Sequence, residues 1–117
     1  MAKILVVEDD DDTRAMFATL LQMQGYAVRA ARNGLEALRA LDADRPCAIL
    51  LDLMMPVMDG FEFRQKQLER PEPVASIPVI CVSAIAKQAE SLGIPCLTKP
   101  VDLGELLELV RGYCRDK

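Results

Sequence analysis

Carboxylate side chains stand at the ends of two apolar runs in this sequence. Ile4–Val7 leads directly into Glu8 and Asp9. A second run, Ile49–Leu51, leads directly into Asp52. Apolar runs bounded by turn residues are typical of parallel strands covered on both faces, and open α/β sheets hold their ligands outside the carboxyl ends of such strands. The two runs therefore predict one acidic pocket.

A cluster of carboxylates needs a cation, because like charges held close together disfavour full ionisation. A hard divalent ion with oxygen ligands suits such a cluster, and Mg²⁺ is the natural candidate. We expect its protein ligands to come from Asp9, Asp52 and the backbone carbonyl of Met54, with Glu8 acting through water. A carboxylate oxygen of Asp52 can also attack phosphorus and form an acyl phosphate.

Two more polar side chains are expected at the same edge of the sheet. A fourth apolar run ends at Ser83, and Lys99 follows a fifth run directly before Pro100. Phosphoryl transfer depends on positioning and on neutralising the equatorial oxygens, which a hydroxyl, an ammonium group and Mg²⁺ can supply. Taken singly, each residue has a structural explanation as a cap, a turn or a surface charge. Their joint placement at four strand ends favours a functional site.

The elements that must position these residues alternate between strands and helices. Five strands are predicted, at Lys3–Val7, Tyr26–Ala31, Ala48–Leu51, Val79–Val82 and Ile94–Leu97. Helices are predicted at Thr13–Gln24, from an Asn33 cap through Leu41, at Phe61–Leu68, around Ala86–Leu92, and after an Asp102 cap. We expect Asp11 or Asp12 to cap the first helix and Gly25 to end it, and we assign Asp59 to a turn with Gly60.

This alternation predicts an α/β fold with a flavodoxin-like, doubly wound sheet of five parallel strands. The expected strand order is 2-1-3-4-5, in which the reversal between strands one and three opens a crevice beside Asp52. A length of 117 residues predicts one domain spanning residues 1–117.

Composition and charge exclude several classes of protein. A net charge of −4 with scattered basic residues argues against direct binding to nucleic acid or to an anionic membrane. No apolar run approaches the ~20 residues of a membrane span, and no signal peptide is evident, so we expect a cytoplasmic protein. The chain has no histidine and no CxxC pair, which excludes the usual zinc and non-haem iron sites. We interpret Cys47, Cys81 and Cys96 as small buried apolar side chains and expect Cys114 to be exposed.

These motifs together resemble the receiver domain of the bacterial two-component response regulators. The resemblance extends over nearly the whole chain, and the motifs that carry it are Lys3–Asp9, Asp52–Gly60, Ser83-Ala84 and Lys99-Pro100. The resemblance implies that a histidine kinase or a histidine phosphotransfer protein donates a phosphoryl group to Asp52. It also implies an acidic pair around Mg²⁺ at Glu8 and Asp9, a switch hydroxyl at Ser83, and a phosphoryl-contacting lysine at Lys99.

The same resemblance implies a stand-alone signalling protein, similar to chemotaxis regulators, rather than an enzyme acting on other substrates. Such a domain catalyses only its own phosphoryl transfer and aspartyl-phosphate hydrolysis, and it signals through altered contacts with a downstream protein, unknown here. Two features depart from the family. Cys96 stands where the family usually has an aromatic switch residue, and only fifteen residues separate Ser83 from Lys99. We therefore expect a shortened or missing fourth helix, an altered output face and a monomer.

Two alternatives remain open at this point. A pseudo-receiver would act as a phosphorylation-independent interaction module, which Cys96 and the short Ser83–Lys99 segment favour. A haloacid-dehalogenase-like phosphatase would also use an aspartyl phosphate, Mg²⁺, a hydroxyl and a lysine. That family needs a second Asp two residues after its nucleophile, and Met54 occupies this position after Asp52.

Overall fold

The structure is a computed structural model that describes residues 2–114. Its centre is one sheet of five parallel strands in the order β2-β1-β3-β4-β5, which confirms the predicted topology. The strands are β1 (Lys3–Val7), β2 (Ala27–Ala31), β3 (Ala48–Leu51), β4 (Val79–Ser83) and β5 (Cys96–Thr98). The predicted limits of β1 and β3 agree with the structure, whereas β5 begins at Cys96 rather than Ile94.

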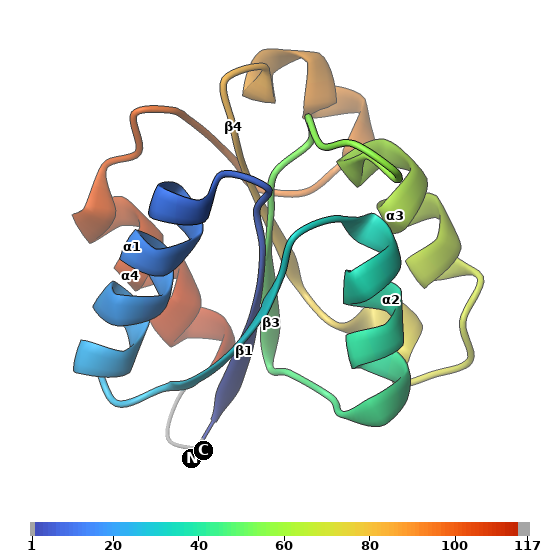
Figure 1. Cartoon of the computed structure of the whole chain (residues 1–117), viewed down its shortest axis with the longest axis horizontal. Coiled ribbons are helices and arrows are strands. Elements are labelled where there is room, and N and C mark those ends of the chain that lie inside the picture. The colour runs from blue at the N-terminus through green and yellow to red at the C-terminus, as the bar shows by residue number, and fades with distance from the viewer. Residues whose placement is uncertain (1, 115–117) are drawn as a thin grey trace.

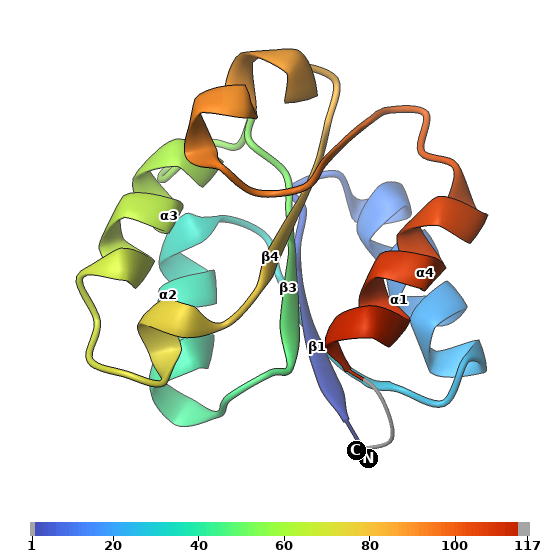
Figure 2. The same cartoon turned by 180° about the vertical axis from the view of Figure 1, so that it is seen from behind.

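Helices cover both faces of the sheet (Figures 1 and 2). The α-helices are α1 (Asp11–Met23), α2 (Gly34–Ala43), α3 (Gly60–Leu68) and α4 (Leu103–Tyr113). Figure 1 shows α1 and α4 on one face and α2 and α3 on the other. Two 3₁₀ helices, η1 (Val74–Ser76) and η2 (Ala86–Leu92), precede β4 and β5 respectively. Within residues 2–114, no helix is long and apolar enough to cross a membrane.

The strands separate two apolar cores because their side chains alternate between the faces. In β1, Leu5 and Val7 join the core beneath α2 and α3, while Ile4 and Val6 join the core beneath α1 and α4. All four residues of β3 are buried, as expected for a central parallel strand. Both cores pack against β1 and β3, and these two strands carry the acidic residues at their carboxyl ends.

Side-chain caps fix where the helices begin. Asp10 caps α1 by accepting hydrogen bonds from the backbone N–H and the hydroxyl of Thr13, so the prediction of Asp11 or Asp12 was wrong. The helix begins two residues earlier than predicted, and its first turn therefore contains Asp11 and Asp12, where negative charge favours the positive end of the helix dipole. Asn33 and Asp102 cap α2 and α4 as predicted.

The connection between β4 and β5 is short, as the sequence predicted. It contains the seven-residue 3₁₀ helix η2 in place of a regular α-helix. A hollow of about 360 Å³ opens between η2 and the edge strand β5, and Cys96 is part of its lining. Figure 2 shows η2 beyond the carboxyl ends of the strands.

The cysteines differ from the prediction. Cys47 and Cys114 form a disulfide across 67 positions of the chain, with 5.4 Å between their Cα atoms. Cys114 is 2% exposed, so its predicted exposure was wrong, and Cys47 is not merely an apolar side chain. The reason is that Leu106, Val110 and Cys114 lie four residues apart on the face of α4 that packs on the sheet. Among the described residues, Cys81 and Cys96 carry free thiols. Cys81 is fully buried as predicted, whereas Cys47 and Cys96 are partly exposed, so their predicted burial was wrong.

Gly60 allows α3 to start directly against the strand end that carries Asp52. Its N–H donates to the carbonyl of Leu53, and a Cβ atom here would lie 2.5 Å from the carbonyl oxygen of Asp52. We expect Gly60→Ala to lower the free energy of unfolding by about 2 kcal/mol, because backbone would have to move. Gly112→Ala is the matched control, since its Cβ would meet nothing within 4 Å, and it should be neutral or stabilising. Equal changes in urea denaturation for both variants would contradict this packing.

Candidate functional site

Three carboxylates meet where β1 and β3 end. Val7 and Leu51 are register partners, so Glu8 and Asp52 follow adjacent strand ends. The backbone N–H of Asp52 donates to the carbonyl of Val7 over 3.0 Å, which extends the pairing by one residue. One carboxylate oxygen from each of Glu8, Asp9 and Asp52 lies within 4.8 Å of the others. This confirms that the predicted acids converge.

Lys99 directly follows β5, the outermost strand beside β4, and its side chain extends back to this cluster. Its ammonium nitrogen lies 2.6 Å from Oε1 of Glu8 and 3.6 Å from Oδ2 of Asp52. Its backbone N–H donates to the carbonyl of Ser83 over 3.2 Å, which ties the end of β5 to the end of β4. The lysine therefore joins the acids from the first and third strands, as the sequence predicted.

Burial sets the electrostatics of the site. Glu8 is 1% exposed and Asp52 is 5% exposed, whereas Asp9 is open to solvent. Burial raises the pKa of the Glu8 carboxyl, and the hydrogen bond from Lys99 only partly opposes this. Burial alone would lower the pKa of Lys99, but its hydrogen bond to Glu8 and the charge of Asp52 raise it. Lys99 thus stays cationic, and it leaves the three acids only partly neutralised.

Ser83 and Met54 lie at the same edge and make local contacts. Ser83 is the last residue of β4 and is fully buried, and its hydroxyl accepts a hydrogen bond from the N–H of Ile85. The N–H of Met54 donates to Oδ1 of Asp52 over 3.4 Å, while its side chain points into solvent. The contact of the Ser83 hydroxyl with a phosphoryl group and the binding of a metal ion by the Met54 carbonyl remain predictions.

Cys96 stands at the position where receiver domains usually have an aromatic switch residue. It is the first residue of β5, and its side chain is partly exposed. Its thiol donates to the carbonyl of Ile94 over 3.3 Å. It also lies 3.9 Å from the carbonyl oxygen of Ala89 in η2. A changed switch at Cys96 remains a prediction.

Arg14 is a site residue that sequence reasoning missed. Its guanidinium donates to the backbone carbonyls of Glu8, over 3.0 Å, and Asp9, over 3.4 Å. It also pairs with Asp11 one turn earlier on α1, and its side chain is only 17% exposed. Arg14 therefore holds the turn that presents the acidic pair. The spacing from Asp11 signals the ion pair, but bonds to backbone carbonyls leave no signature in residue types.

The loop after Asp52 contains a strained turn. Val57 has a φ of +70°, which is unfavourable for a β-branched residue. The N–H of Met58 donates to the carbonyl of Pro56 over 2.7 Å, which closes a three-residue γ-turn around Val57. Asp59, which follows, caps α3 by accepting from the N–H of Glu62, so it is a helix cap as well as a turn residue.

The donor set fits a magnesium ion. Carboxylate oxygens are hard ligands, and Mg²⁺ is bound in proteins through one or two carboxylates together with waters and phosphate oxygens. The cluster supplies Asp9 and Asp52 directly, with Glu8 beside them, and Asp9 faces solvent where water can complete a shell. The residues present can therefore hold this ion.

The raised pKa of Glu8 predicts a pH-dependent stability when divalent metal is removed. The folded state holds the Glu8 proton more tightly, so this contribution to stability is complete below pH 4.5 and is lost as the pH rises through the raised pKa. Relative to Glu8→Gln, the parent should lose at most about 1.4 kcal/mol per pH unit in that range.

Urea denaturation in the presence of a chelator checks this slope. Glu36→Gln is the control, because Arg32 lowers the pKa of Glu36 and its contribution is instead lost as the pH falls. Parallel pH profiles for the parent and Glu8→Gln would contradict the assignment.

Comparisons with known proteins agree with this geometry. The family described as "Response regulator receiver domain" matches residues 4–111. The polar-differentiation response regulator DivK of Brucella anthropi is 31% identical, over 97% of this chain and 96% of that protein. The transcriptional regulatory protein CpxR homolog of Haemophilus influenzae is 34% identical over 98% of this chain. That match covers 51% of the relative, so the chain spans about half of its length.

A solved structure shows the same architecture with a metal bound. The receiver domain of the sensor histidine kinase PA1611 from Pseudomonas aeruginosa superposes with a TM-score of 0.87 and 28% identity, over 97% of each chain. In that protein a magnesium ion is coordinated in the active site cleft. The family match, the topology and the acidic cluster therefore agree.

Proposed function

This chain belongs to the response regulator receiver domain family, whose members are signalling modules of two-component systems rather than classical enzymes, and we propose that it accepts a phosphoryl group at Asp52. The donor is a histidine kinase or a histidine phosphotransfer protein. Domain limits of residues 1–117 are part of this proposal, since the family match itself covers residues 4–111.

The chemistry assigns a separate part to each residue around Asp52. A carboxylate oxygen of Asp52 attacks the phosphorus of the donor phosphohistidine and forms an oxygen–phosphorus bond. The phosphorus–nitrogen bond breaks, and the imidazole nitrogen leaves with the electron pair. Lys99, already 3.6 Å from Asp52, neutralises charge on the transferred group, and the Ser83 hydroxyl contacts it after leaving Ile85.

Glu8, Asp9, Asp52 and the backbone carbonyl of Met54 would hold Mg²⁺, with Glu8 acting through water. When bound, this ion neutralises phosphoryl oxygens and the carboxylates around them. Arg14 contributes by holding the turn that carries Glu8 and Asp9. Protein groups alone thus orient the nucleophile and keep the acidic pair in place.

The observation that carries the proposal is the position of the Lys99 ammonium between Glu8 and Asp52. A phosphoryl group on Asp52 adds about −1.5 to −2 charge and three acceptor oxygens. That charge competes with Glu8 for Lys99, so the loops bearing Lys99 and Ser83 rearrange when Asp52 is modified. The altered loops then change contacts with a downstream protein, and we infer a monomer with an output face modified by the short η2.

The two alternatives are less well supported. A pseudo-receiver has no need of three carboxylates within 4.8 Å of one another and a lysine that pairs with two of them, although Cys96 and η2 remain consistent with one. This chain lacks the general acid that a haloacid-dehalogenase-like phosphatase needs, because Met54 presents an exposed apolar side chain at the required position.

Incubation with acetyl phosphate and Mg²⁺, followed by intact mass spectrometry, tests the proposal. We expect the mass of one phosphoryl group to be added, and we expect a chelator to prevent the addition. Beryllofluoride, a stable phosphoryl mimic, should shift the amide spectrum of residues near Ser83 and Lys99. A protein that gains no mass and shows no shift would be a pseudo-receiver.

A further inference from the structure

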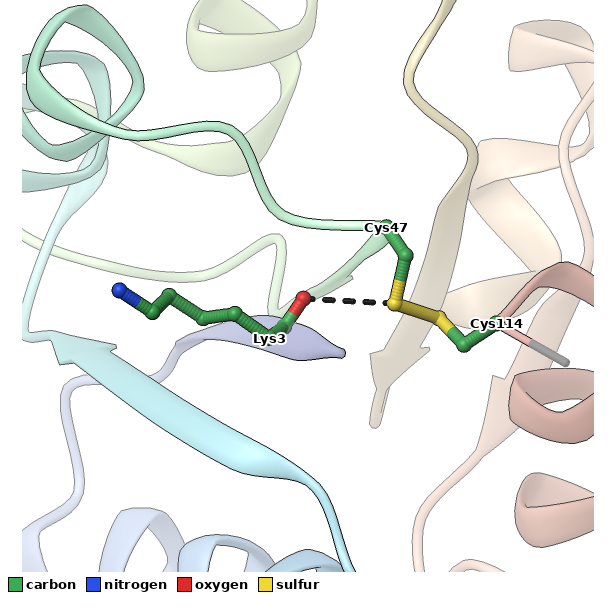
Figure 3. The surroundings of a disulfide bond; sticks show 3 residues. All are labelled: Lys3, Cys47 and Cys114. Carbon is green, nitrogen blue, oxygen red and sulfur yellow. Dashed lines mark hydrogen bonds between the residues drawn. A yellow bond between two sulfur atoms is a disulfide. The ribbon is translucent and has the colours of Figure 1, made fainter. Parts of the chain in front are cut away.

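The disulfide between Cys47 and Cys114 lies at the end of the sheet opposite the acidic site. Cys47 comes directly before β3, and Asp52 directly after it. The four residues of β3 lie between the two positions and separate them by about 16 Å. Cys114 follows the last residue of α4 (Figure 3). The bond therefore joins the start of a core strand to the end of the last helix.

The fold holds both sulfur atoms in place independently of the bond between them. The backbone N–H of Cys47 donates to the carbonyl of Lys3 over 2.8 Å, which continues the β1–β3 pairing. Cys114 is held by its N–H, which donates to the carbonyl of Val110 over 2.8 Å, and by its place on the buried face of α4. Because packing brings the two residues together, the reduced protein keeps its thiols side by side at a high effective concentration.

The surroundings suit a thiol as well as a disulfide. The carbonyl oxygen of Lys3 lies 3.3 Å from the sulfur of Cys47, as the dashed line in Figure 3 shows, so the reduced thiol has an acceptor in place. Cys47 is partly exposed and Cys114 is 2% exposed, which makes Cys47 the sulfur that a small molecule can reach. Cys81 does not compete, since it is fully buried and burial raises its pKa to about 12.

We propose that Cys47 and Cys114 form a reversible thiol–disulfide modification site, which small-molecule disulfides close and small-molecule thiols open. In closing, the Cys47 thiolate attacks the small disulfide and forms a mixed disulfide, and one small thiolate leaves. The Cys114 thiolate then attacks the Cys47 sulfur and releases the second. The two protein thiols lose two electrons and two protons, which the small disulfide gains.

Closing this bond anchors the last turn of α4 to the sheet. That turn contains Gly112, a weak helix former, and the half-exposed Tyr113, so without the disulfide only the burial of Cys114 and its hydrogen bond to Val110 hold the turn. Leu106 and Val110 keep the earlier part of α4 packed in either state. Opening the bond therefore loosens the end of α4 and leaves the acidic site at the other end of β3 unchanged.

Equilibration of the native protein in glutathione buffers tests this proposal. Alkylation and mass spectrometry should show one reversible step of two thiols, assigned to Cys47 and Cys114, with unchanged circular dichroism. Cys96→Ser should keep this step. Cys114→Ser should lose it and carry glutathione on Cys47, whereas Cys47→Ser should react slowly because Cys114 is buried.

Hydrogen exchange supplies a second readout that does not depend on thiol counting. The amide of Cys114 should exchange at least about ten-fold faster in the reduced protein, with the amides of β1 and β3 unchanged. A bond that opens only after denaturation, a two-thiol step that survives in Cys114→Ser, or equal exchange in both redox states would overturn the proposal.

Discussion

Asp52→Asn abolishes the uptake of a phosphoryl group from acetyl phosphate in the presence of Mg²⁺, with an expected loss in rate on the order of 1000-fold or more. The amide has the shape of the carboxylate but is a poor nucleophile toward phosphorus. Asp52 is 5% exposed and is held by the hydrogen bond from its own N–H to Val7, so the substitution should not displace the strand end. Intact mass spectrometry over time measures the loss.

Asp59→Asn is the matched control for this experiment. Asp59 lies seven positions further along the same loop and caps α3, and Asn is as good a helix cap as Asp. The control should therefore gain one phosphoryl group at the parental rate. Equal uptake by Asp52→Asn and the parent, or loss of uptake in Asp59→Asn alone, would contradict the assignment of the nucleophile.

Asp9→Asn should weaken Mg²⁺ binding by about 10- to 100-fold, which corresponds to roughly 1.4 to 2.8 kcal/mol. Asp9 is the solvent-exposed member of the acidic cluster and the one through which a hydrated ion can enter. The substitution removes a charge but keeps the backbone carbonyl that accepts from Arg14, so the turn should keep its shape. Calorimetric titration with MgCl₂ measures the affinity.

Asp12→Asn controls for the general effect of removing negative charge near the site. Asp12 belongs to the same acidic run, but it is exposed in the first turn of α1 and lies outside the cluster. The affinity of the Asp12→Asn protein for Mg²⁺ should differ from that of the parent by less than about two-fold, because exposed charges are screened by solvent and salt. An equal loss of affinity in both variants would show that net charge, rather than coordination, governs binding.

Local patterns explain why much of the fold could be predicted. The apolar runs of β1 and β3 gave both limits correctly, since a central parallel strand is buried on both faces and ends where polar residues begin. The caps at Asn33 and Asp102 were equally clear, because each bonds to a backbone N–H only three residues away. Strand order then brought Glu8, Asp52 and Lys99 to one edge.

Contacts that depend on tertiary structure could not be predicted. The Cys47–Cys114 bond joins residues with no short spacing motif, and it exists because the buried face of α4 continues as far as Cys114. The contribution of Arg14 passes through backbone carbonyls, which carry no sequence signal. The α1 cap was missed for a local reason, because Asp10, Asp11 and Asp12 are equally suitable caps by residue type and only the structure shows which of them accepts from Thr13.

The most direct test of the central claim is to locate the modified residue in the parent protein. Borohydride reduces an acyl phosphate to an alcohol, so treatment after exposure to acetyl phosphate and Mg²⁺ converts a phosphorylated aspartate to homoserine. We predict homoserine at position 52 alone when the peptides are sequenced by mass spectrometry. Homoserine at Asp9 or Asp59, or none at all in protein that had gained a phosphoryl group, would contradict the account.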